Sequence, residues 1–256
     1  MNKSINFINT VPALLMGLAL VGLSFMVTEE FTFSQNTDLT SLKKLRADID
    51  ISAGTIHMGS HNSSIAEFKS VYTKKNYKAE LKLDLKNERL RIHQPQMKNV
   101  NMKEGDKNNW QIKIPKNLDT DLTLKLGAGE GFIDLSNSKI NRMDFEAGAG
   151  NFELNLANTP ITNLIVNAGV GALIITLSGK HNANLKASIN GGIGEIKLIF
   201  PRDAGVRVKV SGLGSIKKGG FKKQDGYYIN EFYRKAADQI DVTVNGGLGE
   251  IYLSLK

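Results

Sequence analysis

Residues 146–156 read EAGAGNFELNL, a Gly-x-Gly step followed by apolar side chains at every second position. After the second glycine, Phe152, Leu154 and Leu156 alternate with polar residues, which is the pattern of a strand with one buried face. The step recurs along the chain, and successive first glycines lie 21, 21, 23, 20 and 35 residues apart. The steps occupy residues 127–129, 148–150, 169–171, 192–194, 212–214 and 247–249.

Each repeat therefore consists of a strand, a Gly-x-Gly step, a second strand and a polar turn. Glycine has no Cβ, so it suits a sharp bend at which a neighbouring repeat crowds against the backbone. The region carries no i, i+3, i+4, i+7 stripe of a helix, so the pattern predicts an all-β chain. Strands of one rung stacking on the next form a β-solenoid, with regular rungs over residues 121–256. When the repeats are aligned on their Gly-x-Gly steps, Ile175 and Leu198 fall at equivalent inward positions of adjacent rungs.

Residues 45–120 carry a less regular version of the same pattern. Residues 49–58 resemble a degenerate first rung, with Gly54 at the bend. Residues 79–92 alternate, turn at Lys86 and Asn87 and alternate again, which predicts a hairpin. We find no linker in this region and expect residues 29–256 to form one continuous domain.

The N-terminus is predicted to be a targeting segment and not a part of the folded domain. Residues 11–27 read VPALLMGLALVGLSFMV, with Lys3 before them and Glu29 and Glu30 after them. This layout is typical of a signal peptide or a signal anchor helix within residues 1–28, and both alternatives stay open. In either case the domain is exported to the periplasmic or extracellular face of the cytoplasmic membrane.

Composition excludes several classes of protein. The chain has 256 residues and a net charge of +8, and it contains no cysteine. Disulfide frameworks, cysteine nucleophiles and thiolate metal sites are therefore excluded. The Gly-x-Gly steps lack the lysine and the following helix of a phosphate-binding loop. His57 and His61 flank a predicted strand end and not a helix, so we expect no metal site and no cofactor.

The segment of residues 108–140 and the closing residues 246–251 resemble the bacterial toast-rack family. The matching features are a strand ending at Pro115, the Leu-Gly-Ala-Gly-Glu step of residues 126–130 and the closing Gly-Gly-Leu-Gly-Glu-Ile. The family includes LiaF-like C-terminal domains and domains labelled "putative adhesin". The resemblance covers residues 45–256 and implies a single-stranded, right-handed β-solenoid on the outer face of a bacterial membrane. It implies no catalytic residue, and it implies roles in adhesion or in regulating an envelope-stress sensor kinase.

The 35-residue gap before the last step holds the most distinctive segment. Residues 217–237 read KKGGFKKQDGYYINEFYRKAA and mix basic with aromatic side chains. One interpretation is a cap that covers the open end of the solenoid. The other is a surface that binds a membrane sensor protein or an anionic envelope polymer. The candidate partner-binding residues are Lys222, Lys223, Tyr227, Tyr228, Phe232, Tyr233 and Arg234.

The sequence thus favours a non-enzymatic envelope protein that presents an interaction surface, adhesin-like or regulatory. The export signal argues against nucleic acid as a partner despite the positive charge. A first alternative is a structural protein whose solenoid ends associate with each other. A second is a carbohydrate-active enzyme that uses the outward Glu153 and Lys197.

Overall fold

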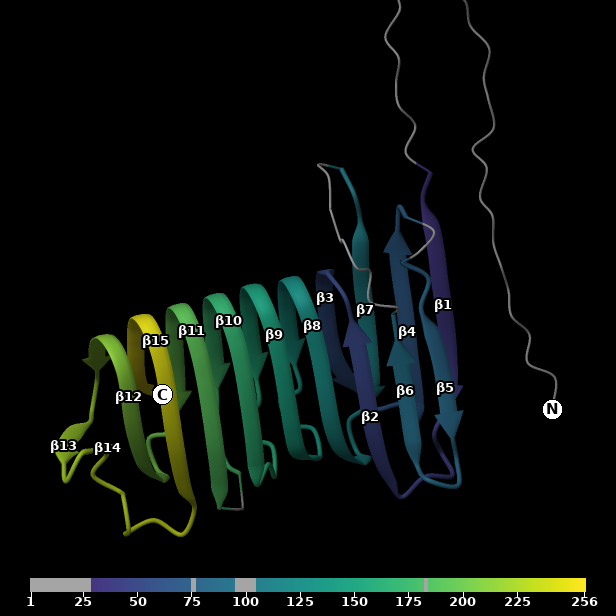
Figure 1. The fold of residues 1–256 in the computed structure, drawn as a ribbon. Coiled ribbons are helices and arrows are strands. Elements are labelled where there is room, and N and C mark those ends of the chain that lie inside the picture. Colours follow the sequence, from purple (N-terminus) through teal and green to yellow (C-terminus); the bar gives the residue numbers. More distant parts are fainter. Residues whose placement is uncertain (1–28, 75–76, 95–104, 182–183) are drawn as a thin grey trace, which may run out of the picture.

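The computed structural model describes residues 29–74, 77–94, 105–181 and 184–256, and within them the chain forms one 15-stranded sheet (Figure 1). The all-β prediction is therefore confirmed. The strands are β1 (Phe31–Asp38), β2 (Lys44–Ile51), β3 (Gly54–His61), β4 (Ile65–Tyr72), β5 (Glu80–Asp84), β6 (Arg89–His93), β7 (Asn108–Pro115), β8 (Asp119–Asp134), β9 (Ile140–Asn155), β10 (Asn163–Thr176), β11 (Leu185–Phe200), β12 (Gly205–Lys218), β13 (Lys222–Gln224), β14 (Tyr227–Ile229) and β15 (Gln239–Leu255).

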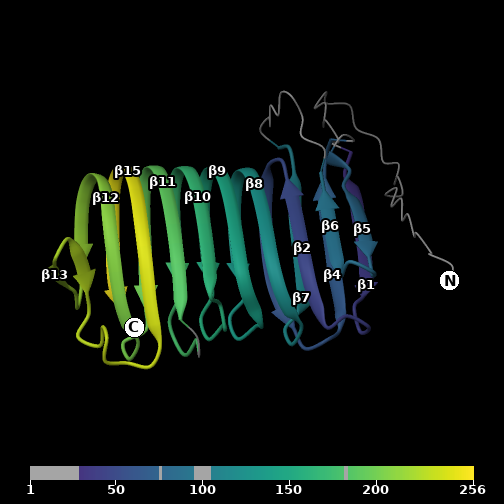
Figure 2. The same ribbon diagram turned by 60° about the horizontal axis from the view of Figure 1, so that its bottom comes forward.

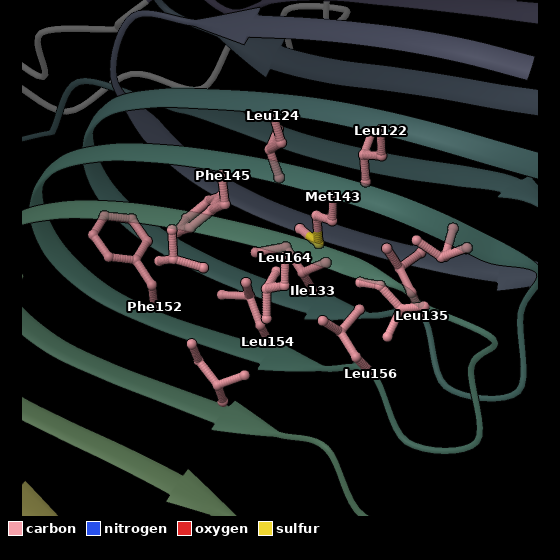
Figure 3. Close-up of a cluster of buried hydrophobic side chains, with 14 of the residues drawn as sticks. Leu122, Leu124, Ile133, Leu135, Met143, Phe145, Phe152, Leu154, Leu156 and Leu164 are labelled. Carbon is pink, nitrogen blue, oxygen red and sulfur yellow. The ribbon is translucent and has the colours of Figure 1, made fainter. Parts of the chain in front are cut away.

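The regular part of the sheet is a stack of long parallel strands, each bent at its Gly-x-Gly step (Figures 1 and 2). The bends lie in register, so that Gly129 pairs with Gly150 and Gly150 with Gly171. The bend folds the first arm of each strand over its second arm, and the inward side chains of both arms form the core. Phe145 and Phe152, on the two arms of β9, meet edge to face with ring centroids 5.5 Å apart (Figure 3).

The alternation of apolar residues aligns from strand to strand as the sequence predicts. Ile175 and Leu198 are register partners on β10 and β11, and both are fully buried. Leucine and isoleucine occupy most inward positions, and aromatic rings such as Phe145 and Phe200 fill others. Figure 3 shows one such cluster around β8 and β9.

The glycines at the bends are required by the approach of the neighbouring strand. A Cβ on Gly150 would lie less than 3.0 Å from the carbonyl oxygen of Gly129, closer than real Cβ atoms approach. Gly150 also has a φ of 146°, a conformation that residues with side chains rarely adopt. The same two constraints act at Gly129, Gly171 and Gly194, which explains why the step recurs.

The strands do not stack in sequence order at the C-terminal end. The sheet runs β11, β15, β12, so the last strand of the chain lies between two earlier ones (Figure 1). Residues 190–194 and 245–249 share the corner sequence Asn-Gly-Gly-x-Gly, and β11 pairs with β15 without a shift. The β12 corner reads Ser-Gly-Leu-Gly, and its pairing with β15 shifts between Ser211 and Leu213. β15 thus continues the register of β11, and β12 takes the last place among the long parallel strands.

The N-terminal part continues both layers of the stack with separate strands. β2 pairs with the first arm of β8 and β3 with its second arm, and Gly54 lies beside Gly129. Residues 49–58 are therefore a first rung, as predicted. The predicted hairpin is confirmed as β5 and β6, which extend the layer of first arms, while β7, β4 and β1 extend the layer of second arms.

The predicted signal or anchor segment, residues 1–28, lies outside the described residues. Within the part of the chain that the structure describes, no helix has the length and hydropathy to cross a membrane. The right-handed winding of the solenoid and the boundaries of its single domain stay predictions.

Replacing Gly150 with alanine is expected to lower the free energy of unfolding by about 3 kcal/mol or more, because the new Cβ collides with backbone that cannot move away. Chemical denaturation measures the loss. Gly59→Ala is the control, since its Cβ would have ordinary contact at 3.7 Å with the carbonyl oxygen of Asp134. That variant is expected to lose about 0.5 kcal/mol or less. Equal losses in both variants would show that the corner has no special role.

Truncation of Ile175 or Leu198 to alanine is expected to cost about 2–5 kcal/mol, because each leaves a cavity in a packed column. The double variant should lose less than the sum, since the two sites are neighbours. Ile165→Ala, at a position that is 36% exposed, is the control and should cost under about 1 kcal/mol. A loss below about 1 kcal/mol at both buried sites would contradict the observed register.

Candidate functional site

The basic and aromatic segment forms a hairpin at the end of the stack. β13 and β14 pair with each other, and β14 lies antiparallel on β12, so that Val208 pairs with Tyr228. Asp225 and Gly226 connect the two short strands with φ angles of 49° and 80°. Positive φ at both residues is typical of the tight hairpin turn that Asp-Gly favours.

One side of this hairpin closes the core. Tyr228 is 8% exposed and Phe221 is 6% exposed, and both belong to the hydrophobic core. The Phe221 ring meets Phe200 edge to face at 5.8 Å. Asn230 attaches the segment to the start of β12, because its Nδ2 donates to the Ala204 carbonyl at 2.7 Å and its Oδ1 accepts from the Val206 amide at 2.9 Å. The capping interpretation is therefore confirmed for these aromatic residues.

The other side of the hairpin carries a cluster around Arg207 of β12. The guanidinium donates two hydrogen bonds to the carboxylate of Asp241 on β15, one of them from Nε to Oδ1 at 3.2 Å. It also lies 4.8 Å from the ring centroid of Tyr227 and 5.6 Å from that of Tyr233. The hydrogen bonds with Asp241 raise the pKa of Arg207. A guanidinium is charged in proteins in any case. The cluster holds both tyrosine rings in place.

A groove of about 880 Å³ opens beside this cluster, within the size range of ligand sites. Its lining contains five basic side chains and two acidic ones, so it favours an anionic occupant. Three aromatic residues, Phe221, Tyr227 and Tyr233, belong to the lining, and the two tyrosines are the less buried of them. The residues that give it this character are Arg202, Arg207, Phe221, Lys222, Asp225, Tyr227, Glu231, Tyr233, Arg234 and Lys235.

Four of the sequence-predicted residues line this groove: Lys222, Tyr227, Tyr233 and Arg234. Three others lie elsewhere on the cap. Tyr228 turns into the core, Lys223 lies over its ring at 5.8 Å, and Phe232 is 38% exposed.

The sequence analysis missed Arg202, Arg207 and Asp241. Arg207 occupies an outward position between two inward valines, and this alternation could have drawn attention to it. The Asp-Gly pair at residues 225–226 is a strong hairpin signal that would have predicted the folded cap.

The residues of the enzymatic alternative are not brought together. Glu153 and Lys197 lie on β9 and β11 with Ile174 of β10 between them. Two strand spacings separate their backbones by roughly 10 Å. Glu153 instead borders a shallow hollow with Asp134 and with His57, whose ring stacks on Phe132 at 5.0 Å.

The remaining histidines have local partners. His61 Nε2 lies 2.7 Å from the Ile65 carbonyl, and His93 faces Asp50 at 3.3 Å. His181 is buried, with Nδ1 2.8 Å from the Thr159 carbonyl. Among the described residues, no three His, Asp or Glu side chains are grouped to hold a metal ion.

Comparisons with known proteins identify the fold. The model of the N-terminal domain of toast_rack (DUF2154) matches residues 26–160 and 143–199. The chain is similar to a "putative cell adhesion protein" from Clostridium sporogenes, with a TM-score of 0.69, 22% identity, and 89% of this chain and 100% of that chain covered. At this identity the likeness shows the fold alone. A "putative adhesin" from Bacteroides fragilis scores 0.32 at 10% identity, covering 88% of this chain and 98% of that one, and carries no argument. No curated protein matches the chain.

Tyr228→Ala is expected to destabilise the protein by about 3 kcal/mol, because it opens the core at the end of the stack. Phe232→Ala removes an aromatic ring of similar size from the same segment, at a position that is 38% exposed. It should cost less than about 1 kcal/mol. Thermal and chemical unfolding of the two variants measures the difference, and comparable losses would mean that Tyr228 does not close the core.

Proposed function

The chain belongs to the toast-rack family, and we propose that it is a non-enzymatic, exported cell-envelope protein that binds an anionic polymer at its capped end. The observation that carries this proposal is the groove around Arg207, where basic side chains surround two oriented tyrosine rings. The proposed role is adhesin-like, in which this groove serves as a binding surface. Export by residues 1–28 is part of the proposal.

The chemistry of the groove supports a sugar-containing polyanion. The Tyr227 ring lies against Arg207 and can stack on a pyranose ring with its other face, whereas the Tyr233 ring is contacted by both Arg207 and Arg234. Arg202, Lys222 and Arg234 are exposed along the same groove and supply charge for phosphate or carboxylate groups. Because these charges face solvent, each contact is weak alone, and a polymer gains affinity by engaging several.

Regulation of a membrane sensor protein is the alternative use of the same surface. Crosslinking in cells from the exposed Phe232 position distinguishes the two, because a sensor would be captured there and a polymer would not. Phe232 is the suitable probe position, since Tyr228 is buried.

Self-association through the stack ends is a second candidate. Within the described residues, β14 pairs with β12 only at Arg207, Val208 and Lys209, which leaves the outer edge of residues 211–218 without a strand partner. Lys217 and Lys218 lie on this edge, and edge lysines oppose strand addition. Size measurements over a range of concentrations test this candidate.

Binding of purified protein to short poly(glycerol phosphate) chains carrying sugars tests the main proposal by calorimetry. The double variant Lys222→Gln/Arg234→Gln should bind about tenfold more weakly, because two charged contacts are lost. The control is Lys69→Gln/Lys139→Gln, which removes the same charge from exposed sites outside the cap. Equal weakening in both double variants would show that net charge alone attracts the polymer. That result would contradict a binding site in the groove.

A further inference from the structure

A row of exposed aliphatic side chains runs along the bent edge of the stack. Val170, Ile193, Leu248 and Leu213 are the central residues of the Gly-x-Gly steps of β10, β11, β15 and β12. They are register partners in that order, and their exposed fractions are 53%, 56%, 56% and 74%. We call this row the corner ridge.

The fold does not require large apolar residues on the ridge. Ala128 and Ala149 hold the same place in β8 and β9, where the register continues across the bend without a shift. The bend therefore forms with a side chain as small as that of alanine at this position. Of the nine large hydrophobic residues that are exposed in the described chain, four gather in the corner ridge. Exposed apolar residues in one continuous strip mark a contact surface, whereas scattered ones do not.

The surface on one side of the ridge is uncharged. The side chains of Asn167, Asn190 and Asn245 form a ladder, in which Asn190 donates to Asn167 at 2.7 Å and Asn245 donates to Asn190 at 2.8 Å. On the other side the Glu250 carboxylate is paired with Lys217 at 3.2 Å, and Glu195, its register partner on β11, is exposed. The cavity beside the ridge measures about 40 Å³, far too small for an organic ligand. The ridge therefore suits a broad, apolar partner.

The path of the chain identifies that partner. Phe31, the first residue of β1, pairs with Tyr72, and Tyr72 pairs with Asn108. The Asn108 carbonyl crowds Gly54, which is the register partner of Gly129. The chain therefore enters the fold at the row of corner glycines, on the edge that carries the ridge (Figures 1 and 2).

Only residues 28–30 separate the apolar segment of residues 11–27 from Phe31. The four residue steps from Val27 to Phe31 span at most about 14 Å. If residues 11–27 enter a bilayer, the edge at which the chain enters the fold must face that bilayer closely.

We propose that the corner ridge is a lipid-facing strip, which lies on the outer leaflet of the membrane that residues 11–27 enter. The stack then lies along the membrane surface and its turns point away from it. A second copy of the chain is a weaker occupant. The four side chains are only partly exposed, and by themselves they offer less than the ~800 Å² that each partner of a stable interface buries. The proposal takes from the proposed function only the membrane location and is independent of the groove.

The chain contains no cysteine, so single cysteines can be labelled cleanly. The full-length protein is reconstituted in vesicles of phosphatidylethanolamine and phosphatidylglycerol, with an environment-sensitive dye at Leu213→Cys. Lipids that carry a shallow nitroxide should quench most of its emission. Lys139→Cys, in the turn between β8 and β9 at the opposite edge, is the matched control and should keep its emission.

Two further variants make the result decisive. In a dye-labelled Ile193→Cys protein, replacing Val170, Leu248 and Leu213 with alanine should greatly reduce quenching, and circular dichroism should stay unchanged because alanine already occupies this row in β8 and β9. A dye at Thr32→Cys reports the chain entry. Quenching at Thr32 without quenching at Leu213 overturns the proposal, because the stack then stands away from the lipid. Shielding of Leu213 that depends on protein concentration and not on nitroxide lipid also overturns it, in favour of a second copy.

Discussion

The whole architecture depends on the close approach of backbone to backbone at the bends. A carbonyl oxygen of one strand occupies the space where the next strand would place a Cβ, as Gly129 does at Gly150. Stacked parallel strands can all bend back at one edge and keep their normal spacing only if the residue at the bend has no Cβ. Once the bends are stacked, the two arms of each strand face each other, and the aliphatic core follows from the alternation of side chains.

This constraint also decides where new chemistry can arise. Along the sides of the stack each strand has a similar neighbour, so outward residues meet repeated surroundings and seldom converge. Glu153 and Lys197 illustrate this, since Ile174 separates them. The end of the stack and its bent edge are different. The end of the stack has no following long strand. At the bent edge, the central residue of each Gly-x-Gly step has a side chain that does not pack in the core.

The capped end gains its groove from the position of β15. Because β15 lies inside the stack, β12 becomes the terminal strand and the segment between them must return across its outer face. That return brings Tyr227 and Tyr233 over Arg207, while Asp241 reaches the same guanidinium from β15. The segment serves both interpretations of its sequence, because one face of the hairpin is apolar and the other is basic.

The sequence by itself determined the local repeat: bent strands, buried columns, the first rung at Gly54 and the β5–β6 hairpin. These features depend on glycine, on the alternation of side chains and on turns, all of which are local. Lys222, Tyr227, Tyr233 and Arg234 were found for the same reason, since they are close together in the chain.

Tertiary structure alone decided the order of the last strands, and with it the union of Arg207 with Asp241 and the burial of Tyr228. Repeated strands are nearly equivalent partners, so local pattern does not fix their order, and the register shift at the β12 corner is seen only in the assembled sheet. The exposed ridge likewise required the assembled stack, because only register shows that Val170, Ile193, Leu248 and Leu213 form one continuous row.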